Sequence, residues 1–324
     1  MSIFSFSLMP ALAASVLAFA YPVPMDQSIE PGVLTKAESD IVAIDQDRAQ
    51  RMTVPVSIKG LGPFSFVIDT GAERTVLSRD IATKLALDAE EPAQLMSIAG
   101  SSMVDMVYVP RLTLGKKNYD SLISPGLLSR HIGADGILGL DGLQDQRILF
   151  DFVANQISIE DTAEPQPMAS APEIVVTAKR RSGQLIFTEA TISGLKVNVI
   201  IDTGAQVSIA NPVLQKRLMQ RAKELGEENS LIAVTGERLG VTFGQARDFR
   251  IGRAQFANLP IAFADAPPFK RLGMGKKPAL LLGMDVLRKF DQVAIDFKER
   301  KIHFLLPKDA KHRYEPAKFT RFKS

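Results

Sequence analysis

The chain has no cysteine and only three histidines among its 324 residues. Without cysteine it cannot form disulfides, thiolate metal sites or a cysteine nucleophile. The histidines, His131, His303 and His312, lie far apart in the sequence and lack the short spacing that is typical of zinc ligands. We therefore expect a protein without a metal site, and nothing in the sequence implies a cofactor.

Long apolar runs are also scarce, apart from one at the N-terminus. Residues 1–25 carry no charged side chain, and Ala18-Phe19-Ala20 supplies the small residues typical of a signal cleavage site. We expect residues 1–20 to be a signal peptide and the protein to be exported, and the lack of cysteine favours a bacterial periplasm. The alternative is an uncleaved membrane anchor facing the periplasm, because no Lys or Arg follows the initiator Met.

The net charge of +3 is concentrated at the C-terminus. Residues 307–324 hold six Lys or Arg and two acidic side chains, so this tail carries +4 and the rest of the chain is near neutral. We expect a solvated basic tail, and contact of the tail with an anionic surface is the alternative. A nucleic-acid partner is not expected, because the basic charge does not indicate a binding face on the folded part.

A tetrapeptide that occurs twice is the most informative feature of the chain. Asp69-Thr70-Gly71-Ala72 and Asp202-Thr203-Gly204-Ala205 lie 133 residues apart, and each follows an apolar run. Six residues after each Asp comes a hydroxyl side chain, Thr75 or Ser208, followed by a β-branched residue. This duplication indicates two halves that each contribute one carboxylate to a shared site.

The repeat extends well beyond the tetrapeptides. Both halves contain, in the same order, a hairpin with a Gly turn before the Asp, a hairpin with Gly at its tip, a further Gly turn, and a late apolar-apolar-Gly segment. Short strands, Gly turns and few helices predict a mostly β fold. The predicted order after the signal peptide is an N-terminal segment (21–48), a first lobe (49–160), a Pro-rich linker (161–172), a second lobe (173–306) and the tail.

These features resemble the aspartic peptidases, and among them the retropepsin-like branch. The Asp-Thr-Gly turn and the later apolar-apolar-Gly each occur twice, and the Ala after each turn is similar to the retroviral-type enzymes. The resemblance implies two homologous, barrel-like acid-protease lobes related by a pseudo-twofold axis, with the active-site cleft between them. Because one chain holds both lobes, the site would be complete in a monomer. A half-active chain that pairs with another copy is the less favoured alternative.

By this resemblance Asp69 and Asp202 are the catalytic pair, which would hold a water and act as base and acid in peptide-bond hydrolysis. Which of the two is protonated at rest stays open. The two threonines would hydrogen-bond across the lobe junction, and the two glycines would allow a tight turn that leaves an N–H free for the carboxylate. The residues expected to support the pair are Thr70, Gly71, Ala72, Thr203, Gly204 and Ala205.

Two hairpin tips, which we call flaps, are expected to cover the substrate. Flap 1 includes Ala99, Gly100 and Ser101, and flap 2 includes Thr235 and Gly236. An extended peptide or unfolded protein segment would pair with them as an added strand, whereas a folded domain would not fit. The sequence thus predicts an aspartic endopeptidase. The alternative is a catalytically silent peptide-binding module that has kept the cleft.

Overall fold

The computed structural model describes residues 40–43, 45–46, 52–143, 146–161, 173–219 and 228–307. The expected signal peptide lies outside these residues, as do most of the N-terminal segment, the linker after residue 161 and the tail after residue 307. Within the described ranges, none of the helices combines the length and the hydrophobicity that a membrane crossing requires.

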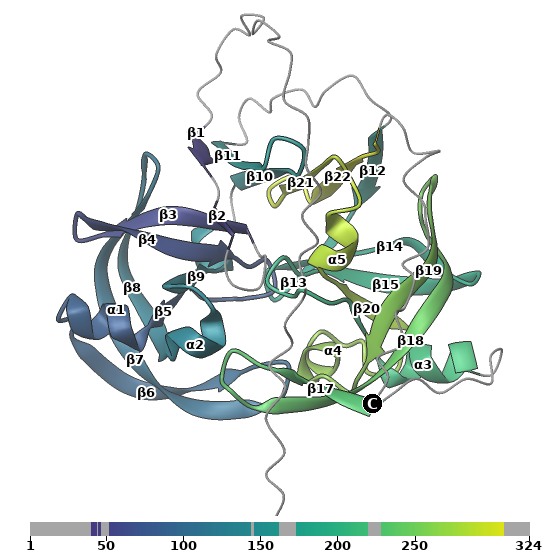
Figure 1. The fold of residues 1–324 in the computed structure, drawn as a ribbon, viewed down its shortest axis with the longest axis horizontal. Helices are drawn as coiled ribbons and strands as arrows, with labels where there is room; N and C mark the ends of the chain where they lie inside the picture. The colour runs from purple at the N-terminus through teal and green to yellow at the C-terminus, as the bar shows by residue number, and fades with distance from the viewer. Residues whose placement is uncertain are drawn as a thin grey trace, which may run out of the picture. The chain divides into compact units, whose positions relative to one another are not determined.

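The first lobe is an eight-stranded sheet in the order β2-β3-β4-β9-β5-β8-β7-β6 (Figure 1). An additional pairing of β3 with β7 curls the sheet toward a barrel. Two short helices, α1 (Arg79–Lys84) and α2 (Ser129–Ile132), follow β5 and β8. The strands are β2 (Asp45–Gln46), β3 (Met52–Ile58), β4 (Leu61–Ile68), β5 (Val76–Ser78), β6 (Ala89–Met96), β7 (Ser101–Leu114), β8 (Lys117–Leu127) and β9 (Gly136–Leu138).

The second lobe is another eight-stranded sheet, in the order β13-β14-β15-β20-β16-β19-β18-β17, and here β14 also pairs with β18. Helices α3 (Pro212–Met219) and α4 (Pro267–Arg271) follow β16 and β19. The strands are β13 (Lys179–Arg181), β14 (Gln184–Ile192), β15 (Leu195–Ile201), β16 (Ile209–Ala210), β17 (Glu228–Ile232), β18 (Arg238–Ile251), β19 (Ala254–Phe263) and β20 (Ala279–Leu282).

The two lobes have the same topology. Adding eleven to each strand number of the first sheet gives the strand order of the second, including the extra pairing. In both, the strand before the Asp turn runs parallel to the strand of the late apolar segment, as β4 with β9 and β15 with β20. The prediction of a mostly β fold with two homologous lobes is confirmed.

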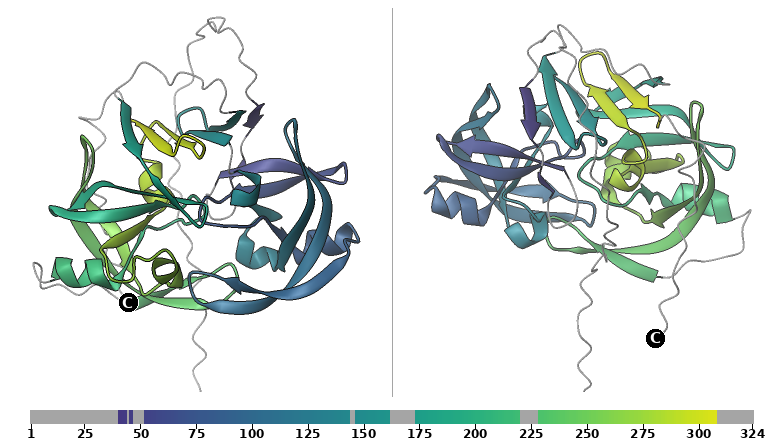
Figure 2. Two further views of the ribbon diagram at one scale, coloured as in Figure 1. Left: turned by 180° about the vertical axis from the view of Figure 1, so that it is seen from behind. Right: turned by 45° about the horizontal axis from the view of Figure 1, so that its top comes forward.

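A third sheet joins the lobes, and the sequence did not predict it. It has six strands in the order β1-β11-β10-β21-β22-β12, three from each half of the chain (Figure 2). Strands β10 and β21 pair antiparallel at its centre, where Gln292 Nε2 donates to Asp151 Oδ2 at 2.6 Å. The strands are β1 (Asp40–Ala43), β10 (Gln146–Asp151), β11 (Gln156–Asp161), β12 (Glu173–Thr177), β21 (Gln292–Asp296) and β22 (Lys301–Leu305).

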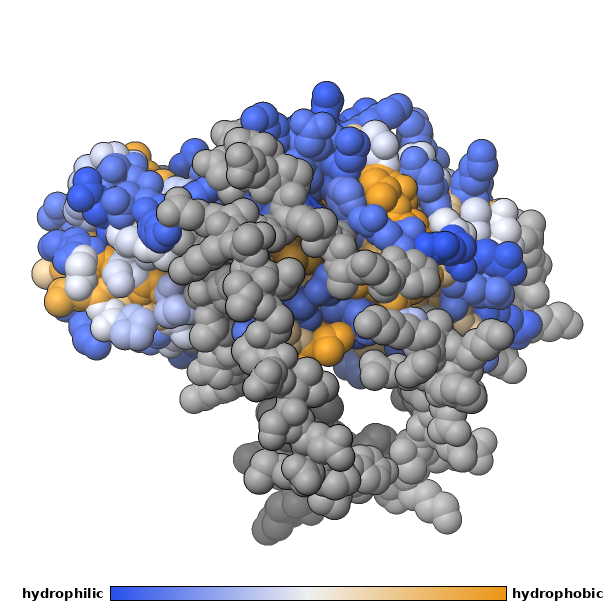
Figure 3. All heavy atoms as spheres, turned by 90° about the horizontal axis from the view of Figure 1, so that it is seen from above, coloured by the Kyte–Doolittle hydropathy of each residue, from blue (hydrophilic) through white to orange (hydrophobic). Residues whose placement is uncertain are grey.

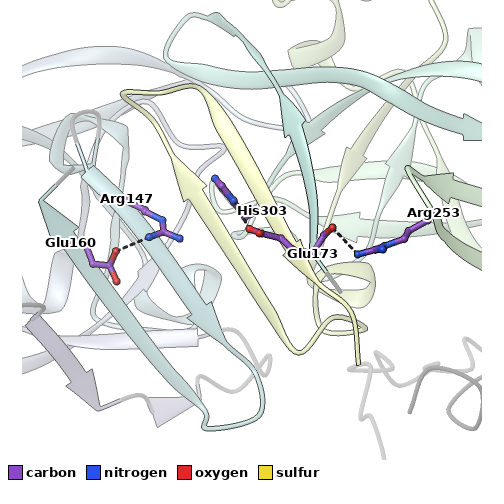
Figure 4. Close-up of polar contacts among 5 residues, drawn as sticks. All are labelled: Arg147, Glu160, Glu173, Arg253 and His303. Carbon is purple, nitrogen blue, oxygen red and sulfur yellow. Dashed lines mark hydrogen bonds and ion pairs between the residues drawn. The ribbon is translucent and has the colours of Figure 1, made fainter. Parts of the chain in front are cut away.

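Polar side chains connect the strands of this sheet to one another and to the second lobe (Figure 4). Arg147 Nη1 donates to Glu160 Oε2 at 3.1 Å, and both side chains are only 4% exposed. His303 Nδ1 lies 2.6 Å from Glu173 Oε1, and Arg253 Nη2 donates to the Glu173 carbonyl at 2.9 Å. The contact of Arg147 with Glu160 connects β10 to β11. Its two charges can be buried because each is paired with the other. The other two contacts fasten β12 to β22 and to the β18–β19 turn of the second lobe.

The hairpins that lead into the two Asp turns follow from local turn chemistry. Lys59-Gly60 joins β3 to β4, and Ser193-Gly194 joins β14 to β15. All four residues have a positive φ, between 48° and 77°. Two-residue hairpin turns of this kind match the twist of the strands and favour Gly at the second position. The two predicted hairpins with Gly turns are therefore confirmed.

A continuous hydrophobic core runs through both lobes and the six-stranded sheet. Phe66 of the first lobe, Phe150 of the six-stranded sheet and Phe187 of the second lobe belong to one buried cluster, and each is at most 1% exposed. This shared core therefore holds the two Asp-bearing turns on a common support. In the face shown in Figure 3, hydrophilic side chains cover most of the described surface.

Candidate active site

The two Asp turns begin where β4 and β15 end. In each lobe the parallel neighbour strand fixes the Asp main chain, because Asp69 N donates to Leu138 O at 3.0 Å and Asp202 N donates to Leu282 O at 3.1 Å. Leu138 and Leu282 belong to the late apolar segments that the sequence analysis paired with the turns. The two motifs of each half therefore form one structural unit.

Each Asp carboxylate is held by its own turn. Asp69 Oδ1 accepts the N–H groups of Gly71 at 2.7 Å and of Ala72 at 3.0 Å. Asp202 Oδ1 accepts the corresponding N–H groups of Gly204 at 3.1 Å and of Ala205 at 3.0 Å. Two N–H donors on one oxygen fix the carboxyl orientation and leave the other oxygen, Oδ2, for further partners.

The two glycines are required because the opposite Asp lies against them. A Cβ added to Gly71 would be 2.8 Å from Asp202 Cγ, and one added to Gly204 would be 2.2 Å from Asp69 Oδ2. Neither glycine is among the positive-φ residues of the described chain. The expected N–H donation is present, and a residue without Cβ was expected to allow the tight turn; the structure shows that an added Cβ would meet the carboxyl group of the opposite turn.

The two carboxyl groups differ in their surroundings. Asp202 is 8% exposed, whereas Asp69 is partly exposed. Burial, together with the neighbouring Asp69 charge, raises the pKa of Asp202 to about 8, although the N–H groups of Ala205 and Gly204 oppose the shift. Two carboxyls this close cannot both ionise readily, so the pair retains one proton at neutral pH.

The two threonines lock the turns together across the lobe junction. Thr70 Oγ1 donates to Ile201 O at 3.0 Å and accepts from Thr203 N at 3.2 Å. In the reciprocal arrangement, Thr203 Oγ1 donates to Ile68 O at 2.8 Å and accepts from Thr70 N at 3.1 Å. These are the cross-lobe hydrogen bonds that the resemblance implied for Thr70 and Thr203.

The flaps are the tips of two long hairpins, β6–β7 and β17–β18, which lie side by side in Figure 1. Ala99, Gly100 and Ser101 lie at the tip of the first hairpin, and Thr235 and Gly236 lie at the tip of the second. Thr235 Oγ1 lies 3.3 Å from Ser97 Oγ, so the two tips are in contact. The structure thus brings the expected flap residues of both lobes together.

Comparison with known proteins decides the family. The sequence profile of a family described as aspartyl protease matches residues 54–141 and 188–286, one segment in each lobe and together more than half of the chain. The chain belongs to the aspartyl protease family. The predicted retropepsin-like aspartic peptidase is thereby confirmed as its class.

One curated relative is DNA damage-inducible protein 1 of Chaetomium globosum, which is 26% identical over 136 residues. The match covers 42% of this chain and 27% of that protein, so only a minor part of the relative is represented here. The likeness supports the lobe fold of the aspartyl protease and carries no information about the remainder of the relative.

A second pair of polar contacts in this aspartyl protease lies beneath the turns, and the sequence analysis missed it. Thr75 Oγ1 donates to Asp141 Oδ1 at 2.7 Å, and Ser208 Oγ donates to Asp285 Oδ1 at 2.7 Å. Each hydroxyl also accepts the N–H of the late glycine, at 3.2 Å in the first lobe and 3.0 Å in the second. Burial raises the pKa of Asp285, while the hydrogen bonds from Ser208 oppose the shift.

The signal for these contacts was present in the sequence. A hydroxyl residue follows each Asp by six positions, and an acidic residue follows each late glycine by two. The recurrence of both in each half could have indicated a contact. Its consequence is that each Asp turn is attached to its own lobe through a carboxyl group, which belongs to the exposed Asp141 in the first lobe and to the partly buried Asp285 in the second.

The rim of the site contains an ion pair between the lobes. Arg271 Nη2 of α4 lies 2.5 Å from Glu73 Oε2, just after the first Asp turn, and the side chains are 44% and 39% exposed. The pair borders an open hollow of about 350 Å³ that is also lined by Leu140, Ser182 and Gly183. At this exposure the pair contributes little to stability.

Proposed function

We propose that this protein is an aspartic endopeptidase that hydrolyses peptide bonds with a water held between Asp69 and Asp202. The observation that carries the proposal is the mutual approach of the two Asp turns, in which each carboxyl group lies against the glycine of the other lobe. Such an arrangement places two carboxyls around one small volume. One proton shared between them supplies both a base and an acid.

The different surroundings of the pair assign the two roles. Asp202 retains the shared proton because burial disfavours its charge, so Asp69 is the base. Asp69 takes a proton from the water as the oxygen attacks the carbonyl carbon, and Asp202 gives its proton to the carbonyl oxygen. The tetrahedral diol then collapses as Asp69 protonates the leaving nitrogen and Asp202 recovers a proton from a diol hydroxyl. The C–N bond is broken and the pair returns to its starting state.

An extended peptide fits the surroundings of this pair. The flap hairpins supply main-chain groups for added-strand pairing, and each lobe presents an apolar cluster beside its Asp turn. Ala72 packs against the cluster of the first lobe, and Val207 packs against that of the second. The proposed substrate is therefore a peptide or unfolded segment with apolar side chains near the scissile bond.

The working form that we propose is a monomer exported to the periplasm, or held there by its N-terminal segment. Support for the monomer comes from the six-stranded sheet, in which three strands from each half of one chain meet at the central β10–β21 pair. Support for export comes from the uncharged N-terminal run and the lack of cysteine. Fractionation of the native host, with detection of residue 21 as the new N-terminus, would test the export proposal.

The proposed reaction can be tested with residues 21–324, a library of unstructured peptides and a range from about pH 3 to about pH 8. Products are identified by mass spectrometry for the wild type and for the Asp69→Asn and Asp202→Asn variants. Cleavage that disappears in both variants establishes one shared pair. Cleavage that persists in either variant assigns the reaction to another site. Binding of peptides without cleavage at any pH would instead identify a silent binding module.

A further inference from the structure

Two segments of the second lobe concentrate basic side chains. Residues 179–183 and 265–278 together hold seven Lys or Arg and a single acidic residue, Asp265. The chain before the C-terminal tail is near neutral overall, so these charges are a local feature. The seven side chains are all exposed, and they are Lys179, Arg180, Arg181, Lys270, Arg271, Lys276 and Lys277.

The fold brings the two segments together. Arg181 Nη1, at the end of β13, donates to Leu272 O just after α4 at 2.5 Å, and a Cβ at Gly273 would be 2.3 Å from the same nitrogen. Lys270 of α4 lies against the turn that follows, since a Cβ at Gly275 would be 3.3 Å from its Cγ. The cations of β13, of α4 and of this turn therefore form one surface, which we call the basic wall.

The basic wall borders the first Asp turn. Arg271 Nη2 lies 2.5 Å from Oε2 of Glu73, the residue directly after Ala72 of that turn. A Cβ at Gly183, in the β13–β14 turn, would be 3.0 Å from Leu140 Cδ1, and Leu140 N donates to Ala72 O at 2.9 Å. The residues of both contacts line the open hollow of about 350 Å³. One side of this hollow is therefore basic.

The scaffold does not require these charges, because the first lobe forms the same topology without them. The first-lobe counterpart of β13 is β2, which consists of Asp45–Gln46. Residues 128–135 connect β8 to β9 and contain one Arg, one His and one Asp, whereas the longer segment 264–278 connects β19 to β20 and contains α4. The basic wall is thus an addition to the second lobe, and its place beside the Asp turn indicates a role in ligand binding.

A peptide carboxylate is the ligand that this wall fits best. The Arg271 guanidinium has five N–H donors and the contact with Glu73 uses Nη2, so further donors can bind a second carboxylate. Lys276 and Lys277 add charge that attracts an acidic chain over about 8 Å at physiological salt. Because the wall borders a hollow beside the Asp turn, a peptide chain can follow it inward, whereas a planar lipid surface cannot.

We propose that the basic wall binds Asp or Glu side chains of the substrate, at positions outside the apolar residues next to the scissile bond. This inference rests on the proposed peptidase function, from which it takes the ligand to be a peptide. It narrows the substrate class to acidic peptides and acidic segments of unfolded proteins. Because β2 and the β8–β9 connection of the first lobe carry no equivalent charge, the acidic side chains bind on one side of the scissile bond only.

Paired peptides test this preference. An unstructured peptide with apolar residues at its centre is synthesised with either Glu or Gln at each flanking position in turn, and kcat/KM is measured with residues 21–324. Glu at the favoured positions should raise kcat/KM at least about fivefold, through KM, and on one side of the scissile bond only. In about 1 M salt, where the Debye length falls to about 3 Å, the preference should disappear.

Variants of the exposed cations assign the preference to the wall. Arg271→Gln, and separately Lys276→Gln with Lys277→Gln, should each lower the ratio of Glu-peptide to Gln-peptide kcat/KM about threefold or more. Lys276→Glu with Lys277→Glu should reverse the preference in favour of a Lys peptide. The matched control is Lys196→Gln with Lys298→Gln, which removes two exposed lysines outside the wall and should leave the ratio unchanged.

Peptide binding separates this inference from the proposed function. Fluorescence anisotropy gives Kd for dye-labelled Glu and Gln peptides without any need for cleavage. If no peptide is cleaved but Glu peptides bind at least about fivefold more tightly, and the wall variants lose this difference, the peptidase function fails and the acidic-ligand inference stands. Equal cleavage and binding of Glu and Gln peptides would overturn the inference, as would a preference that survives in every wall variant. Wall-dependent binding to phosphatidylglycerol vesicles without a preference for acidic peptides would also overturn it, and would identify a lipid-binding surface.

Discussion

Gly204 lies against the carboxyl group of Asp69 more closely than Gly71 lies against that of Asp202. A Cβ at position 204 would be 2.2 Å from Asp69 Oδ2, whereas one at position 71 would be 2.8 Å from Asp202 Cγ. Both distances are shorter than any that a folded protein accommodates without movement. The two turns thus have the same topology, but an added side chain at position 204 would have less space than one at position 71.

Gly204→Ala should therefore be more damaging than Gly71→Ala. The added methyl group of Gly204→Ala must displace the Asp69 carboxyl or separate the turns, which should cost about 3 kcal/mol of unfolding free energy and at least about 100-fold in kcat/KM. Gly71→Ala should cost less in stability and still impair cleavage. Urea denaturation and peptide kinetics on both variants check the order, and equal losses would contradict the difference in clearance.

Replacing Asp202 by Asn should stabilise the fold at neutral pH and have little effect in acid. The raised pKa of Asp202, about 8, means that the folded state binds its proton more tightly than the unfolded state, whose Asp pKa is about 3.9. The stability that this proton provides is complete below about pH 4 and is lost as the pH rises toward about 8. The Tm difference between Asp202→Asn and wild type should grow with pH across this window. A constant difference would show that Asp202 is not held protonated.

The same proton should set the alkaline limit of catalysis. If Asp202 must be protonated to act as the acid, log(kcat/KM) should decline with a slope of about −1 above a midpoint near pH 8. A peptide without titratable side chains isolates the enzyme's own ionisations. An alkaline midpoint near pH 5 would show that the pair loses its shared proton much earlier than the burial of Asp202 implies.

Thr203→Val should separate packing from hydrogen bonding at the lobe junction. Valine preserves the shape of the side chain but removes the hydroxyl, which leaves the Ile68 carbonyl and the Thr70 N–H buried without this partner. The expected loss is about 2–4 kcal/mol, measured by urea denaturation. Thr203→Ser, which retains the hydroxyl, is the matched control and should lose about 1 kcal/mol or less. Similar losses in both variants would indicate that packing dominates.

The hairpins and the Asp turns could be predicted from the sequence because their determinants are local. Lys59-Gly60 and Ser193-Gly194 specify the turns before the aspartates, and the duplicated tetrapeptides identify the two carboxyl groups. The duplication also predicted that the lobes share one topology, since two copies of one pattern must bury their apolar faces in the same way.

The six-stranded sheet and the packing of each flap tip on the opposite lobe could not be predicted in this way. Alternating apolar residues predict that β10 and β21 are strands, but they do not specify that each pairs with the other lobe. Likewise Val234 has the pattern of a hairpin tip, and nothing local indicates which lobe it contacts. The sequence predicted a residue without Cβ in each Asp turn, but it could not identify the opposite carboxyl that a Cβ would meet, because that group is more than 130 residues distant.

The two lobes share one strand order, but corresponding side chains beside the Asp turns and at the flap tips differ in charge. A perfectly symmetric cleft would accept a polypeptide in two equivalent orientations, N-terminus to either side. Here the symmetry ends at the side chains: Glu73 beside the first Asp turn corresponds to Gln206 beside the second, and Ser101 beyond the first flap glycine corresponds to Glu237 beyond the other. In the proposed peptidase, the two orientations of a bound chain would therefore meet different charges, and the duplicated scaffold would distinguish the amino side of a scissile bond from its carboxyl side.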